Sequence, residues 1–450
     1  MAEERERAQN TREFFATDEI SIFEQENIFF NSGLQGKIPF GTVYEVAVNS
    51  NRLDNSLTRR ETARFSPEYE SDLTLTLTQP LLRDFGSDVN MTQVRIAESN
   101  LRMSQHDLRS KVNEIAVQVM TAYYETIFAQ ENIRVKRDAI DVANALLEEN
   151  QRRLDLGVMK PIDVIQAEAS VSEAEEALIA AESFLVARQN TLKSLIFADF
   201  EAVALLRIEA ADQLSWSAPE VGDGATLLAE ALASNPQMLR QREQISQEDV
   251  RLKYAKNQVK PRVDLQASIG YNGLDGDWGG SFRDYGERRG PEWTAGIIFS
   301  YPLGNRAAKA QLAESELRRE QATYNAAFMK NSIAAALATA VDKVKANQRR
   351  LATTGKSVEL AQKGAEAEQK RLENGLTTTY NVSQMQRELS NARTRQLGAV
   401  VELNQAVSEM YQIVGRIPQL EEHINLVFPD DQTIPADPGA IDRLMEMPAK

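Results

Sequence analysis

The sequence contains no cysteine and only two histidines, His106 and His423. The absence of cysteine excludes disulfides, thiolate catalysis, zinc ribbons and a lipid-modified amino-terminal cysteine. Two histidines are too few for a multi-histidine metal site. No apolar run approaches the roughly 18–20 residues that a transmembrane helix needs. The first residues, MAEERERAQN, lack the apolar core of a signal peptide. By these absences alone the chain would be a soluble protein without metal or cofactor.

Positive charge is in the minority. Lysine and arginine number 51 against 66 aspartates and glutamates, so the net charge is −15. An acidic surface repels the phosphate backbone, and we therefore expect no nucleic-acid partner. The hydrophobic share of 42% and the charged share of 26% are typical of a folded protein. The aromatic share of 7% is low for a chain built on globular cores.

The chain contains an internal repeat. Leu154 and Gly157 in RRLDLGVMKPIDV correspond to Leu372 and Gly375 in KRLENGLTTTYNV, a shift of 218 residues. Each half has the same order: a strand, a junction with proline, a very long helix, a turn with glycine and a second long helix. This order divides the chain into an amino-terminal segment (1–39), repeat 1 (40–198), a connecting segment (199–224), repeat 2 (225–415) and an acidic, proline-containing tail (416–450).

The helices are predicted to be long. Residues 89–155 contain neither proline nor glycine, and apolar or small residues recur there, and over 306–373, at spacings of three and four. At 1.5 Å per residue each helix would be about 100 Å long. Such a helix must pack along neighbouring helices, as in a coiled coil. On the helices alone, a structural coiled-coil rod or scaffold protein is the simplest interpretation.

Four stretches alternate between apolar and polar residues. They are Tyr44–Val48, Leu73–Leu77, Val263–Tyr271 and Trp293–Tyr301. Period two predicts strands with one apolar face, and we expect each of these strands to be near the 9–11 residues that a tilted strand needs to cross a bilayer. Residues 272–292 between the last two are rich in glycine and predict a polar, outward-facing loop.

Strands in a bilayer must close into a barrel, because an open edge leaves backbone groups without hydrogen bonds in hydrocarbon. Single-chain bacterial barrels begin at eight strands. Four strands per chain therefore require several copies. Two copies would give a barrel filled by side chains, and three would give twelve strands with room for water.

The duplicated hairpins, and the junctions LTQPLL and FSYPLG with Pro80 and Pro302, resemble the TolC-like outer-membrane efflux protein family over nearly the whole chain. The resemblance implies a mainly α fold with β structure. Three protomers would form a twelve-stranded transmembrane β-barrel continued by an α-helical tunnel across the periplasm of a Gram-negative bacterium. It also implies a passive exit duct, not an enzyme, that serves a periplasmic adaptor protein and an inner-membrane pump in efflux or type I secretion.

Two features depart from the family pattern. A helix is predicted over about 225–260 in the second half, whereas the corresponding place in the first half contains dissimilar residues, among them 12–27, which could add a strand. The family has a signal peptide and one more helix upstream, so we expect a processed, truncated or mis-started chain. Carboxylates that the family often carries at the second tip are replaced here by Asn381 and Gln384.

The hairpin tips are the candidate functional sites. Gly157 and Gly375 are predicted to cap their helices in the left-handed conformation. Pro161 lies near the start of the next helix and Asp163 in its first turn. The residues expected to dock the adaptor are Leu156, Gly157, Val158, Pro161, Gly375 and Leu376. Those expected to line a constriction are Asp163 and, in the second hairpin, the neutral Thr377, Asn381 and Gln384. The simpler alternative is that these residues only form the turns, and the exported substrate is left open.

Overall fold

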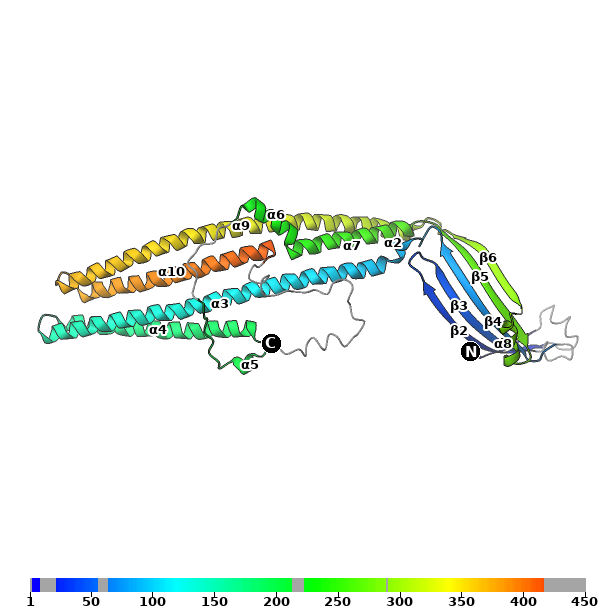
Figure 1. The fold of residues 1–450 in the computed structure, drawn as a ribbon, viewed down its shortest axis with the longest axis horizontal. Coiled ribbons are helices and arrows are strands. Elements are labelled where there is room, and N and C mark those ends of the chain that lie inside the picture. Colours follow the sequence, from blue (N-terminus) through cyan, green and yellow to red (C-terminus); the bar gives the residue numbers. More distant parts are fainter. Residues whose placement is uncertain (1, 9–21, 56–63, 213–221, 289, 417–450) are drawn as a thin grey trace. The chain divides into compact units, whose positions relative to one another are not determined.

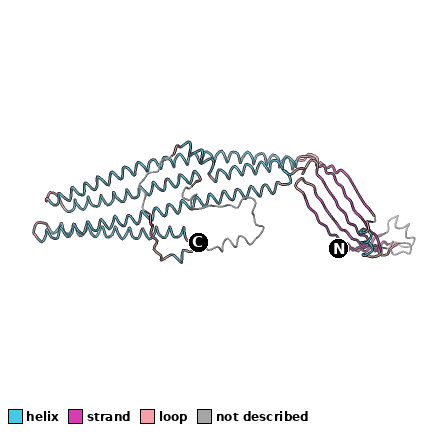
Figure 2. Tube along the Cα trace, viewed as in Figure 1, coloured by secondary structure: helices cyan, strands magenta, loops and turns pink. Residues whose placement is uncertain are grey.

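The computed structural model describes residues 2–8, 22–55, 64–212, 222–288 and 290–416 (Figure 1). The chain divides into two units. Unit 1, Met1–Leu101 and Glu243–Tyr324, contains the strands, and unit 2, Arg102–Arg242 and Asn325–Lys450, contains the helical hairpins (Figure 2). His423 and the tail beyond residue 416 lie outside the described residues.

Unit 1 contains an antiparallel sheet whose strands follow sequence order. They are β1 (Ala2–Ala8), β2 (Ile22–Lys37), β3 (Val43–Asn55), β4 (Glu68–Pro80), β5 (Arg262–Asp275) and β6 (Pro291–Ser300). The four predicted stretches coincide with β3 to β6, except that Tyr301 follows the end of β6, and these strands are confirmed. Two further strands, β1 and β2, precede them, so the described residues form a six-stranded sheet, and four membrane-spanning strands per chain stay a prediction. Residues 22–27 of the segment predicted to add a strand belong to β2, and residues 12–21 lie outside the described part of the chain.

The register of the sheet joins the apolar residues into rows. Leu34, Val46, Leu75, Ile269 and Trp293 are successive partners from β2 to β6. Because side chains alternate between the faces of a sheet, this row lies on one face and its neighbours on the other.

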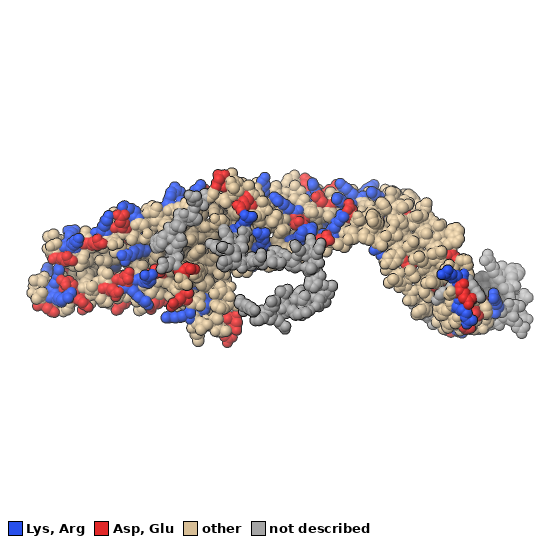
Figure 3. Space-filling view, in the orientation of Figure 1, with Lys and Arg blue, Asp and Glu red and all other residues tan. Residues whose placement is uncertain are grey.

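The adjacent row is polar. Glu45, Thr76, Ser268 and Thr294 are successive partners from β3 to β6, and the last two hydroxyls lie 2.6 Å apart. The apolar face therefore has a polar face behind it over at least four strands. In the view of Figure 3, the middle of the sheet is almost free of charged side chains.

The glycine-rich segment between β5 and β6 contains a helix, α8 (Trp278–Gly286), so the prediction of a simple loop is wrong. Packing against the sheet explains the difference. The Trp278 ring meets Tyr69 edge-on at 4.9 Å between centroids. The buried hydroxyls of Ser71 and Ser281 lie 2.9 Å apart. These partners lie some 200 residues apart in the sequence, beyond the reach of local propensity.

The long helices occur close to their predicted places. They are α3 (Thr92–Asp155), α4 (Pro161–Ile196), α9 (Arg306–Glu373) and α10 (Thr379–Val414). A short α2 (Ser87–Asn90) precedes α3, and the connecting segment contains α5 (Phe200–Val203). No helix in the described part of the chain has the length and apolar character needed to cross a membrane.

The single helix predicted over about 225–260 is two helices, α6 (Gly224–Ser234) and α7 (Pro236–Gln258). Proline has no amide hydrogen and is favoured at the first position of a helix. Asn235 caps the second helix, since its Oδ1 accepts hydrogen bonds from the amides of Gln237 and Met238 at 2.9 and 3.2 Å. The break therefore has a local cause, the pair Asn235–Pro236.

The main core of unit 2 packs α6 against α9 and α10. Leu227, Leu337, Val344 and Leu403 are buried there together with small residues such as Ala406. Small residues let helix backbones approach closely, which is why a chain with so few aromatics can still build a core. Elsewhere the helix surfaces carry mixed charges in the view of Figure 3.

Candidate functional site: the hairpin tips

The two helical hairpins of unit 2 turn through the same backbone geometry. Gly157 and Gly375 have φ angles of 71° and 70°, the left-handed conformation that the sequence predicted. In the first turn the amides of Gly157 and Val158 donate to the carbonyls of Leu154 and Arg153 at 2.9 and 3.0 Å. This pair of bonds is the Schellman motif, which satisfies carbonyls at a helix end.

The second turn repeats these bonds. The amides of Gly375 and Leu376 donate to the carbonyls of Leu372 and Arg371 at 3.0 and 2.8 Å. The helices that follow begin at Pro161 and Thr379, again 218 residues apart. The sequence repeat is therefore a structural repeat at the level of single hydrogen bonds.

Asp163 lies half-buried in the first turn of α4. Its amide donates to the carbonyl of Lys160 at 3.0 Å, while its carboxylate forms no ion pair among the described residues. A carboxylate at this end of a helix is favoured by the helix dipole. The helix dipole therefore favours the negative charge of Asp163, and no neighbouring side chain among the described residues forms an ion pair with it.

The two tips are bonded to each other inside one chain. The buried Asn150 of α3 donates through Nδ2 to Thr379 Oγ1 at 3.0 Å and to the carbonyl of Asp163 at 3.5 Å. Arg153 donates to the carbonyl of Leu372 at 3.1 Å. A small apolar cluster, Leu146, Leu372 and Val382, lies alongside. Sequence patterns could not reveal Asn150 or Arg153, because Thr379 and Leu372, their partners in the second hairpin, lie about 220 residues away.

An ion pair supports this contact. Arg153 Nε lies 2.8 Å from Glu149, and the arginine holds the pKa of that carboxyl below its ordinary value. Glu149 is therefore negatively charged at neutral pH. The ion pair contributes to stability at pH values above the lowered pKa of Glu149. This contribution is lost only as the pH falls through that pKa, because the carboxyl group is then protonated.

Apolar side chains project from both turns. Leu156, Val158 and Leu376 are exposed by 77%, 73% and 68%. Ile162 and Tyr380, which the sequence did not single out, are also more than half exposed. We call these five residues the apolar tip. Exposed apolar clusters at the end of a structural element are typical of protein–protein contact sites.

The polar candidates of the second hairpin have charged neighbours. Thr377 Oγ1 bonds the Glu368 carboxylate, and Asn381 donates to Thr377 at 3.1 Å. Gln384 accepts from Arg387 at 2.8 Å. The sequence-based view of a neutral second hairpin is therefore incomplete, since a carboxylate and a guanidinium contact these side chains.

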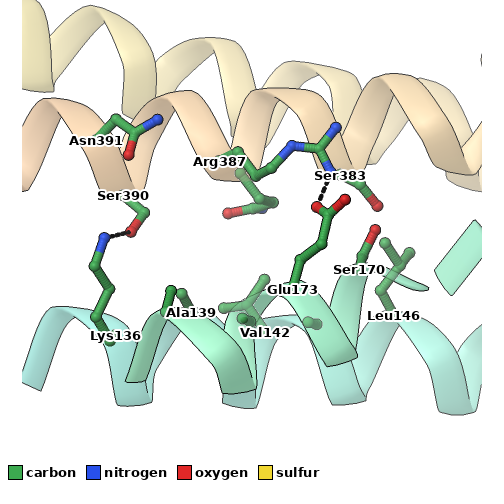
Figure 4. Close-up of a pocket in the computed structure, with 14 residues that line it drawn as sticks. Lys136, Ala139, Val142, Leu146, Ser170, Glu173, Ser383, Arg387, Ser390 and Asn391 are labelled. Atoms are coloured by element: carbon green, nitrogen blue, oxygen red, sulfur yellow. Dashed lines mark hydrogen bonds and ion pairs between the residues drawn. The ribbon is translucent and has the colours of Figure 1, made fainter. Parts of the chain in front are cut away.

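A cavity of about 170 Å³ lies between α3, α4 and α10 (Figure 4). Arg387 donates to Glu173 at 2.9 Å on one side of it, and Lys136 donates to Ser390 at 3.4 Å on the other. Burial lowers the pKa of Lys136. Apolar side chains such as Val142 line the rest of the cavity.

The junction between strands and helices lies where the sequence placed it. Pro80 ends β4 and is buried, and Pro302 follows β6 and is exposed. The sequence missed Asn257, whose side chain donates to the carbonyl of Leu82 at 3.2 Å and accepts from the amide of Asp84 at 2.7 Å. Asparagine bonds, as well as proline, therefore fix the turn after β4.

Together these features define a protein with duplicated helical hairpins and an amphipathic antiparallel sheet. The family model described as outer membrane efflux protein matches residues 43–196 and 227–416, and the chain belongs to this family of outer membrane efflux channels. A comparison with curated proteins gives no match.

Solved structures of outer-membrane channels have the same fold. The outer-membrane channel OprN has 16% identity and a TM-score of 0.62, covering 87% of this chain and 81% of that one. The outer membrane protein VceC of Vibrio cholerae has 18% identity and a TM-score of 0.61, covering 87% of each chain. The MtrE outer membrane channel of Neisseria gonorrhoeae, in its open state, has 14% identity and a TM-score of 0.61, covering 86% and 80%.

The glycine caps can be tested by paired substitutions. Gly157→Ala and Gly375→Ala should each lower the free energy of unfolding by about 1–2 kcal/mol, because alanine is strained in the left-handed conformation. No atom within 4 Å would meet the new Cβ at either position, so the effect is purely one of backbone conformation. Gly364→Ala, inside α9 where the nearest atom is Met385 Sδ at 3.9 Å, should stabilise by about 0.5–1 kcal/mol. Denaturant unfolding measures all three, and equal effects would contradict the assigned turns.

Proposed function

We propose that the chain forms a trimeric exit duct in the outer membrane, through which substrates delivered by an inner-membrane pump leave passively. The observation that carries this proposal is the apolar row that runs from Leu34 to Trp293 across the sheet with a polar row behind it. Trp293, Ile297 and Phe299 are exposed by 76%, 69% and 69% in the single chain. A membrane would cover this face, and the opposite face would line water.

Closure follows from the same sheet. The edge of β6 is unpaired in the described residues, and such an edge cannot persist in hydrocarbon. Copies of one chain can satisfy each other's edges by forming a ring. Family membership and the resemblance support three copies with four spanning strands each. A channel of this kind has no chemistry to perform and needs no cofactor.

The apolar tip supports a partner at the end of the hairpins. Its exposed leucine and valine side chains would dock the periplasmic adaptor, which links the duct to the inner-membrane pump. The pump selects the cargo, so this chain serves either efflux or type I secretion with the same duct. A coiled-coil scaffold would use the helices equally well, but it leaves the apolar face of the sheet without a cover.

Trimeric closure predicts a defined mass. The purified chain should require detergent and should give three copies by native mass measurement or chemical crosslinking in detergent. A stable monomer or dimer that conducts in bilayers would contradict closure by three copies. A chain that stays monomeric and soluble without detergent would favour the scaffold.

If the apolar face of the sheet contacts lipid, an arginine on that face should destabilise the protein more than an arginine at a neighbouring position on the polar face. Leu75→Arg and Ile297→Arg should each destabilise the membrane-inserted protein by about 2–4 kcal/mol if they lie near the bilayer midplane. Thr76→Arg and Thr294→Arg, on the polar face, should be much milder. Urea unfolding from lipid vesicles measures the difference. Equal costs on both faces would mean that the assigned orientation is wrong.

The constriction predicts a role for Asp163. A ring of three carboxylates would attract cations at the narrow end of the duct, because rings of charged side chains govern ion selectivity. Asp163→Ala should raise single-channel conductance or weaken cation preference in planar bilayers. Asn381→Ala, in the second hairpin, should change conductance with little effect on selectivity. Unchanged values for Asp163→Ala would leave this residue as a helix-start carboxylate only.

A further inference from the structure

We call strands β3 to β6 the candidate membrane sheet. The edges of its two outer strands, β3 and β6, differ in the single chain. The edge of β6 pairs with nothing in the described residues, whereas the edge of β3 is covered by β2 from Gln25 to Lys37. If the duct closes with four strands per chain, the β3 edge is where β6 of the next copy must bind. In the single chain that place is occupied.

Strand β2 matches β6 as a partner for β3. All neighbouring strands are antiparallel, so β2 and β6 both run opposite to β3. Phe30 and Leu34 of β2 lie on the same face as Val46, where they are exposed. Trp293 and Ile297 of β6 belong to that same apolar face. A second copy's β6 can therefore take the place of β2 with the same direction and the same apolar side.

A ring that keeps β2 in place cannot close well. With all six strands, β6 of one copy would have to pair with β1 of the next. That strand is short, Ala2–Ala8, and positions 3 to 7 are all charged. A spanning strand needs about 9–11 residues, and charges facing hydrocarbon are costly.

A ring of five strands per chain fails for another reason. It would put β6 beside β2 of the next copy, and these two strands are parallel. Bacterial single-chain barrels are antiparallel throughout with an even number of strands. Among β1, β2 and β3, the described strands that could provide the partner edge, only β3 is both long enough to span and antiparallel to β6.

We propose that β2 is a placeholder strand, which protects the edge of β3 in the single chain and is displaced by β6 of a second copy during assembly. This inference rests on the proposed channel function. The exchange keeps the backbone hydrogen bonds of β3 satisfied at both stages. It also explains why β2 carries an apolar side: an uncovered β3 edge would be a template for uncontrolled pairing.

A disulfide tests the exchange, and the absence of cysteine makes the design simple. Asn31 and Asn49 are partners between β2 and β3, and Asn49 and Asp72 are partners between β3 and β4. Partners across a strand pair lie about 4.5–5.5 Å apart at Cα, within the range of a disulfide. The variant Asn31→Cys/Asn49→Cys locks β2 in place. The matched control Asn49→Cys/Asp72→Cys locks two strands that stay together.

Assembly in detergent and channel insertion into planar bilayers are measured for each variant, oxidised and reduced. We expect the oxidised β2–β3 variant to remain monomeric and to give at least tenfold fewer channels than its reduced form. The control should assemble equally in both states. A second disulfide variant, Leu34→Cys/Val46→Cys, crosslinks β2 to β3 on the apolar face and should behave like the first. Agreement between the two variants excludes a local effect of the substitutions at Asn31 and Asn49.

Two results would overturn the proposal. If the oxidised β2–β3 variants assemble and conduct as well as the reduced ones, β2 is a permanent strand. If no variant conducts, the unmodified chain included, the proposed channel itself fails and the exchange fails with it. The control variant separates these two cases. If the oxidised control conducts and the oxidised β2–β3 variant does not, the loss of channels results from holding β2 on β3.

Discussion

Backbone hydrogen bonding in hydrocarbon is the constraint on which this structure depends. A sheet with one apolar face can be stable in a bilayer only if its edge amides and carbonyls are paired. The chain supplies an apolar face across five strands, with Leu34, Val46 and Leu75 in one row. It leaves the β6 edge open among the described residues. The proposed closure by several copies and the exchange at β3 both follow from that requirement.

The helical hairpins follow a different physical rule. In water, long helices with modest apolar stripes are stable only when they pack along each other, and their turns must satisfy the carbonyls at the helix ends. Gly157 and Gly375 do so through identical bonds. Asn150 and Arg153 then connect the two tips, so that the repeat acts as a pair of linked hairpins. The exposed apolar tip is the surface that the proposed docking of an adaptor would use.

Much of this arrangement could be predicted from sequence because it rests on local patterns. Period-two alternation located β3 to β6, the proline- and glycine-free run located α3, and the 218-residue repeat aligned the glycine turns. What was missed depends on distant partners. Helix α8 forms where Trp278 meets Tyr69. The split at Asn235–Pro236 had a visible signal that the helical periodicity on either side obscured. Strand β2 alternates less regularly, and its pairing with β3 appears only in the register.

The central claim is that the face of Trp293 lies against lipid. The chain has three tryptophans, so Trp216→Phe and Trp278→Phe leave Trp293 as the only indole. Its fluorescence can then be measured in vesicles of ordinary lipid, in vesicles with brominated acyl chains and with an aqueous quencher. The account predicts strong quenching by the brominated lipid and little by the aqueous quencher. Quenching by the aqueous reagent alone would contradict it, because Trp293 would then face water.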